Sequence, residues 1–199
     1  MSLEQSMADE SSHLLRIYTL GRFAVYRGDA LITEATWKRR KAKNLFKLLL
    51  LAPDYMILKD QVFEWLWPNQ SPAQAANNLH YTLFILRRIL QPNLTKAANS
   101  HYISLEGDRL ALNPDSIAWI DIAEFERLIR LGRQRDNLAD YEAARALYQG
   151  DFLPEDLYED WTNEPRERLK ITYADLLQRI GSLYQQRNAF SDAIDCLLD

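Results

Sequence analysis

Side chains that can recognise nucleic-acid bases occur at helical spacing shortly after residue 70. Ser71-Pro72-Ala73-Gln74 has the form of a capping box with proline at the first helical position, so it predicts the start of a helix. On that helix Asn77, Asn78 and Tyr81 fall on or beside the outward face. The asparagine amides have the geometry to bond adenine, and Tyr81 can contact a thymine methyl group or a phosphate.

Basic residues near this helix are candidates for phosphate contacts. Arg87 and Arg88 lie further along the same helix, where they suit contacts that fix position without reading sequence. Arg40, Lys43 and Lys47 share one outward face of the helix predicted upstream, and a phosphate backbone along that face explains the arrangement. A lysine-rich solvated surface is the alternative interpretation of this cluster.

The elements that position these residues follow from apolar periodicity and turn residues. The leucines at 79, 83, 86 and 90 hold the inner side of the third helix, and Pro92 ends it. The other predicted elements are strands within 14–32, helices at about 37–52 and 59–67, and a hairpin over 101–112 turning at Gly107-Asp108. Strands, three helices and a terminal hairpin predict an α+β winged helix-turn-helix domain over residues 14–116. Residues 1–13 are predicted to be a tail that is either disordered or not native to the protein.

Residues 117–199 predict an all-α, tetratricopeptide-like domain. Gly132 and Gly181 each follow a large apolar residue and precede an aromatic and a small residue, which is close to the tetratricopeptide signature. The two glycines lie 49 positions apart, so an insertion at roughly 150–164 must separate the repeats. The second repeat stops inside its second helix at Asp199, which predicts truncation at the C-terminus.

Charge divides the chain in the same way. Residues 14–115 contain 14 Lys and Arg against 8 Asp and Glu, whereas residues 116–199 contain 10 against 17. The first part therefore has a net charge of +6 and the second −7. This asymmetry favours a polyanionic partner for the first part only.

Other classes of protein are disfavoured by what the sequence contains. The single cysteine, Cys196, cannot form an internal disulfide and suits a reducing compartment. The three histidines lack metal-ligand spacing, and the scattered glycines form no phosphate loop. The sequence thus predicts a cytoplasmic protein that is not an enzyme, has no cofactor or metal, and does not enter a membrane.

Several segments together resemble the bacterial transcriptional activator domain family, which includes regulators of antibiotic synthesis. The matching segments are Trp37-Lys38-Arg39-Arg40-Lys41-Ala42, Leu66-Trp67-Pro68, Ala75-Ala76-Asn77-Asn78-Leu79-His80, Leu86-Arg87-Arg88-Ile89-Leu90, Trp119-Ile120-Asp121, Leu147-Tyr148-Gln149-Gly150-Asp151-Phe152-Leu153 and Glu159-Asp160-Trp161. The resemblance implies a DNA-binding activator that acts on direct-repeat promoter sites. Its implied partners are double-stranded DNA, RNA polymerase and a second copy on tandem sites.

The chain departs from this family pattern at the third helix and the hairpin. Phe84 and Ile85 stand where similar winged helices tend to have Arg or Lys, and Glu106 stands at the position that often inserts Arg into the minor groove. Arg109 is close enough in sequence to substitute there. The alternative function is a protein-interaction or oligomerisation module whose winged helix no longer binds DNA.

Overall fold

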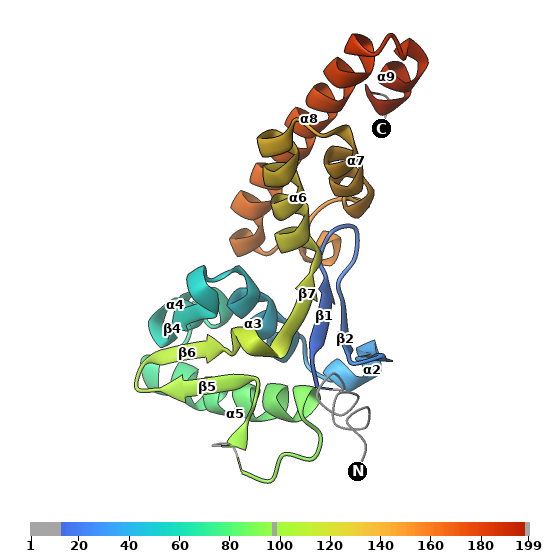
Figure 1. The fold of residues 1–199 in the computed structure, drawn as a ribbon. Helices are drawn as coiled ribbons and strands as arrows, with labels where there is room; N and C mark the ends of the chain where they lie inside the picture. Colours follow the sequence, from blue (N-terminus) through green and yellow to red (C-terminus); the bar gives the residue numbers. More distant parts are fainter. Residues whose placement is uncertain (1–12, 97–98, 198–199) are drawn as a thin grey trace, which may run out of the picture. The chain divides into compact units, whose positions relative to one another are not determined.

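The computed structural model describes residues 13–96 and 99–197, which form two compact units (Figure 1). The first unit contains the described residues up to Arg16 together with Val25–Ala118. The second contains Ile17–Ala24 and the described residues from Trp119 onward. Apart from His13, the predicted tail at 1–13 lies outside the described residues.

The two units differ from the two domains predicted from sequence in the placement of residues 17–24. The prediction assigns these residues to the first domain, but they pack with the second unit. Leu20 forms an antiparallel bridge with Phe152, and the N–H of Leu153 donates to the carbonyl oxygen of Thr19 at 2.9 Å. These partners lie far away in sequence, so no local pattern could reveal them.

The strands form two sheets. They are β1 Leu15–Tyr18, β2 Ala24–Arg27, β3 Ala30–Leu31, β4 Met56–Leu58, β5 Ile103–Glu106, β6 Arg109–Leu112 and β7 Ile117–Ile120. One sheet has the order β3-β2-β1-β7, and the other has the antiparallel order β4-β6-β5. The predicted hairpin is confirmed, with Glu106 opposite Arg109 and Gly107 at a φ of 56° in the turn. The sequence pattern did not indicate β4 or β7.

Helices were predicted at about 59–67 and from Pro72 to before Pro92, and the structure has an α-helix close to each of these ranges. The helices are α2 Glu34–Trp37, α3 Arg40–Leu51, α4 Lys59–Leu66, α5 Pro72–Leu90, α6 Asp121–Arg135, α7 Leu138–Leu147, α8 Asn163–Gln186 and α9 Phe190–Leu197. Short 3-10 turns occur at Pro53–Tyr55, Pro114–Ser116, Pro154–Asp156 and Asp160–Thr162. The last two lie within residues 150–164, where the insertion was predicted, and this segment joins α7 to α8.

The beginning of the helix predicted at 37–52 was wrong by three residues. Lys38 has a φ of 53°, so α2 ends before it and α3 begins only at Arg40. The ring of Trp37 is buried with its centroid 5.8 Å from that of Phe46. Burial of a large aromatic ring offsets the strain of one positive φ, and the resulting bend places Arg39 outside the helix.

The second unit is built on close helix approach and a buried carboxylate. A Cβ atom added at Gly132 of α6 would lie 2.6 Å from the ring of Tyr141 on α7, so glycine is required for this approach.

Asp121, at the start of α6, is 1% exposed. Its Oδ2 accepts from the N–H groups of Thr19 at 2.5 Å and Leu20 at 2.8 Å, and its Oδ1 accepts from the Thr19 hydroxyl at 2.6 Å. Burial raises the pKa of Asp121, and these donors act in the opposite direction.

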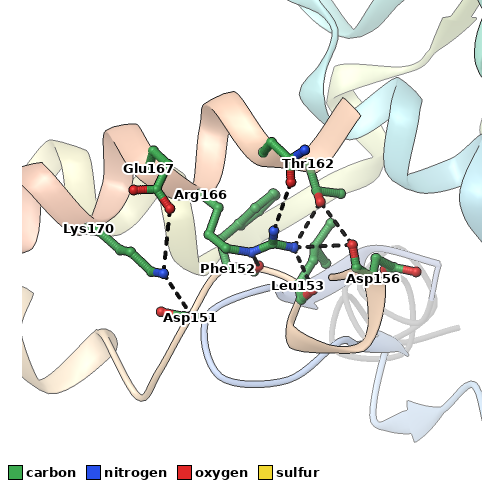
Figure 2. Close-up of polar contacts among 9 residues, drawn as sticks. Asp151, Phe152, Leu153, Asp156, Thr162, Arg166, Glu167 and Lys170 are labelled. Atoms are coloured by element: carbon green, nitrogen blue, oxygen red, sulfur yellow. Dashed lines mark hydrogen bonds and ion pairs between the residues drawn. The ribbon is translucent and has the colours of Figure 1, made fainter. Parts of the chain in front are cut away.

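One buried arginine orders the link between α7 and α8 (Figure 2). Arg166 of α8 is 5% exposed, and its guanidinium donates to the carbonyl oxygens of Phe152 at 3.1 Å, Leu153 at 3.4 Å and Asp156 at 3.2 Å. Its Nη2 also donates to Thr162 Oγ1 at 2.8 Å. A guanidinium presents five donors in a rigid fork, so this single side chain determines the path of the link.

Candidate nucleic-acid interface

Helix α5 is positioned by the signals read from its sequence. The Ser71 hydroxyl accepts from the N–H of Gln74 at 3.4 Å, and the Gln74 side chain accepts from the N–H of Ser71 at 3.1 Å, which confirms the capping box. The inward leucines are fully or almost fully buried, at positions 79, 83, 86 and 90. The opposite face of α5 is consequently directed away from the core.

That opposite face presents polar, aromatic and cationic side chains together. Asn77 and Arg88 are exposed, and Tyr81 and Phe84 are 50% and 52% exposed. The guanidinium carbon of Arg88 lies 5.3 Å from the centroid of the Phe84 ring. The apolar ring of Phe84 therefore contacts the Arg88 guanidinium, so the outward face of α5 has a positive charge beside Phe84.

Arg39 joins this face, although the sequence pattern did not place it among the candidate site residues. Its guanidinium carbon lies 4.9 Å from the centroid of the Tyr81 ring. Because of the bend at Lys38, Arg39 precedes α3 and has an extended backbone, with φ −135° and ψ 125°. The direction of its side chain is therefore not set by the helical geometry of α3. Only the density of basic residues at 38–41 could have pointed to it.

Two predicted contact residues of α5 have other partners. Asn78 is half-buried, and its Nδ2 donates to Oε1 of Gln70, so its amide is committed within the protein. Arg87 is also half-buried, and its Nε donates to the carbonyl oxygen of Ile103 on β5 at 3.1 Å. Burial lowers the pKa of Arg87. Arg87 therefore connects α5 to the hairpin, a role that the predicted phosphate contact did not include.

The prediction that Arg40, Lys43 and Lys47 share an outward face was wrong for the two lysines. Residues 42–49 of α3 are all buried, so this helix lacks a solvated side over two turns. Lys47 is 1% exposed, and Nζ of the buried Lys43 lies 2.5 Å from Oε1 of Glu34. Long lysine stems can be covered in this way by apolar neighbours. Arg40, at the first position of α3, is exposed.

The β5–β6 hairpin retains one candidate cation. Arg109 is exposed and lies opposite Glu106 in the ladder. Asp108 is within 3.4 Å of Lys59 Nζ, and its carbonyl oxygen accepts from the N–H of Lys59 at 2.9 Å. Lys59 therefore offsets part of the negative charge that the sequence places at this turn.

No metal centre or membrane-spanning helix was found in the part of the chain that the structure describes. Among those residues, no cluster of three or more His, Cys, Asp or Glu side chains is arranged to hold a metal ion. None of the described helices combines the length and the apolar character needed to cross a bilayer.

Comparison with known proteins gives a fold likeness. No family model matches the chain, and no curated protein matches it by sequence. The structure of Mycobacterium tuberculosis EmbR in complex with a low-affinity phosphopeptide is similar, with a TM-score of 0.62 and 16% identity. The similarity covers 92% of this chain and 57% of that one. The chain therefore has an EmbR-like fold, a mixed α+β part followed by a helical part, and it spans little more than half of the EmbR chain.

Proposed function

We propose that the first unit is a winged helix-turn-helix that binds double-stranded DNA, and that the chain is a transcription regulator. In this proposal α5 is the recognition helix and enters the major groove, while β5 and β6 form the wing. The observation that supports it best is the exposed face of α5, where Asn77 is flanked by Tyr81 under Arg39 and Phe84 under Arg88. The resemblance to bacterial transcriptional activators supports the same function.

The proposed interface differs from the one expected from sequence. Asn77 and Tyr81 read bases, and phosphate contacts come from Arg39, Arg40, Arg88 and Arg109. Asn78, Arg87, Lys43 and Lys47 are left out of it because of their burial or their partners within the protein. The regulator further binds tandem direct repeats as head-to-tail protomers, acts with RNA polymerase and works in the cytoplasm. The second unit is the tetratricopeptide-like part of this assembly.

A protein-interaction module is the second candidate function. The half-exposed rings of Tyr81 and Phe84 favour it, since exposed apolar groups on a helix usually contact a partner. The two cations stacked on these rings favour DNA instead. The two functions differ in whether the chain binds a nonspecific duplex at low salt.

The salt dependence of DNA binding tests the proposed phosphate contacts. Each neutralised phosphate releases condensed counterions, so the four arginines predict a slope of log K against log salt of about −3.6. Arg88→Ala should flatten the slope by about 0.9 and weaken all sequences alike. Binding is measured by fluorescence anisotropy on a short duplex over a series of salt concentrations.

Two control variants accompany this measurement. Arg130→Ala removes an exposed arginine from the second unit and should leave the slope unchanged. Arg87→Ala should also leave the slope unchanged but lower the melting temperature, because it loses the hydrogen bond to Ile103. A slope near zero in the unsubstituted chain would favour the interaction module.

Sequence readout is tested separately at Asn77. Asn77→Ala should cost about 1–3 kcal/mol on the preferred site and much less on random DNA, because an amide that bonds adenine is lost. A selection from a random duplex library identifies the preferred site, and His80→Ala is the control because His80 is exposed on the same helix. Equal losses on both kinds of DNA would show that Asn77 does not read bases.

A further inference from the structure

A basic groove lies in the first unit, at the C-terminal end of α5. Its volume is about 920 Å³, and it is lined by the start of β1, the turn between β2 and β3, and the C-terminal end of α5. Arg16, Arg27, His13 and His101 line it, whereas Asp29 is its only carboxylate among the described residues. Its wall also includes apolar groups, at Leu14, Leu90, Pro92 and Tyr102.

Hydrogen bonds hold the walls of this groove in place. Arg27 Nη1 donates to the carbonyl oxygen of Leu90 at 3.0 Å, which ties β2 to the end of α5. The Tyr102 hydroxyl donates to the carbonyl oxygen of His13 at 2.5 Å. Arg16 remains 45% exposed at the side-chain level, and its contact with Asp29 is long, at 3.7 Å. The groove thus has walls tied by hydrogen bonds, and two arginines line it against one carboxylate among the described residues.

The second unit presents a complementary protrusion. Tyr158 is 95% exposed and the adjacent Leu157 is 52% exposed. They lie in the acidic run Glu155-Asp156-Leu157-Tyr158-Glu159-Asp160, directly after the Asp156 carbonyl oxygen that Arg166 binds. An aromatic side chain held on an ordered backbone loses little entropy when it binds. We call Leu157 and Tyr158 the Leu-Tyr tip.

We propose that the Leu-Tyr tip of one copy of this chain inserts into the basic groove of a second copy. The tip supplies an aromatic and an aliphatic group for the apolar lining groups, and the exposed carboxylates of Glu155 and Asp160 supply negative charge for the two arginines. A pocket of this volume is of the size that holds a compact ligand, here two side chains. Charge complementarity is the reason for choosing a second copy, because the acidic tip and the basic groove occur on the same chain.

The contact is heterologous, so each copy uses its tip on one neighbour and its groove on the other. It therefore deepens the head-to-tail arrangement proposed above and rests on that proposed function for its effect on DNA. Two side chains bury far less area than the roughly 1,200 Å² of a stable interface. Association should accordingly be weak in solution and stronger on tandem sites, where DNA raises the effective concentration.

The test combines sedimentation velocity with binding to duplexes that contain one or two sites. Tyr158→Ser and Arg16→Glu should each abolish self-association and reduce the preference for the double site by about tenfold, a loss typical of an interface anchor. Ile171→Ser is the control, because Ile171 is 63% exposed on α8 of the same unit. Single-site affinity and melting temperature should be unchanged in all three.

Mixing the two variants gives the decisive measurement. Tyr158→Ser retains its groove and Arg16→Glu retains its tip, so their mixture should form a heterodimer although neither variant self-associates. The absence of a heterodimer would overturn the proposal. If Arg16→Glu lost self-association while Tyr158→Ser kept it, the groove would have a different occupant and the proposal would also be overturned. If the proposed DNA-binding function were wrong, the unsubstituted chain would not bind a single-site duplex, although the two variants would still form a heterodimer when mixed.

Discussion

Arg166→Met is expected to lower the free energy of unfolding of the second unit by about 3–5 kcal/mol, since it leaves buried polar groups without their partner. The carbonyl oxygens of Phe152, Leu153 and Asp156 each accept a hydrogen bond from this guanidinium. Methionine fills similar volume but donates to none of them. Urea denaturation followed by fluorescence measures the loss, because Trp161 is buried in the same link.

Lys170→Met is the matched control for Arg166→Met. Lys170 lies one turn further along α8, and its half-exposed Nζ contacts Asp151 at 3.3 Å and Glu167 at 3.6 Å. Exposed ion pairs contribute only about 0–1 kcal/mol, so this variant should unfold almost like the unsubstituted chain. Equal losses in the two variants would show that the Arg166 hydrogen bonds have no special weight in stability.

Asp121→Asn is expected to cost the second unit about 2–4 kcal/mol, because one amide oxygen replaces two carboxylate oxygens that both accept buried hydrogen bonds. Oδ2 of Asp121 accepts from both Thr19 and Leu20, and Oδ1 accepts from the Thr19 hydroxyl and the N–H of Ile122. An asparagine can satisfy only one of these two oxygen positions, since its Nδ2 is a donor. Hydrogen exchange at the amides of Thr19 and Leu20 should accelerate together with the loss of stability.

Thr19→Val separates the carboxylate from its individual donors. Valine removes only the hydroxyl that donates to Oδ1 at 2.6 Å and retains both backbone N–H groups. Its cost should be nearer 1 kcal/mol, roughly the usual net value of one hydrogen bond. If exchange at Thr19 and Leu20 remained slow in Asp121→Asn, the segment 17–24 would be held in the second unit by other contacts.

Helix α5 shows how far local sequence reasoning extends. The capping box at Ser71 and Gln74 and the leucines at 79, 83, 86 and 90 predicted its start and its buried face, and both are confirmed. These features depend on hydrogen bonds and periodicity within one helix. The predicted face also placed Asn77, Tyr81 and Arg88 on the exposed side, where the structure has them.

The basic residues show where that reasoning ends. Lysine and arginine are residue types expected on a cationic surface. Lys43 and Lys47 are nevertheless buried, and Arg87 donates a hydrogen bond to the carbonyl oxygen of a strand residue. Arg39 was not singled out and lies against Tyr81. A positive charge has no periodicity of its own, so its environment depends on which distant segments cover it.

Local sequence was sufficient to predict α4, α5 with its inner face, and the hairpin turn at Gly107, because each depends on groups within a few residues of one another. Which cations reach the surface, and which unit the segment 17–24 joins, depend instead on contacts between segments that are far apart in sequence. That segment joins the second unit because Asp121 and Leu153, more than 100 residues away, provide the hydrogen-bond partners for its backbone. Buried backbone groups must be paired, and only folding brings such partners together.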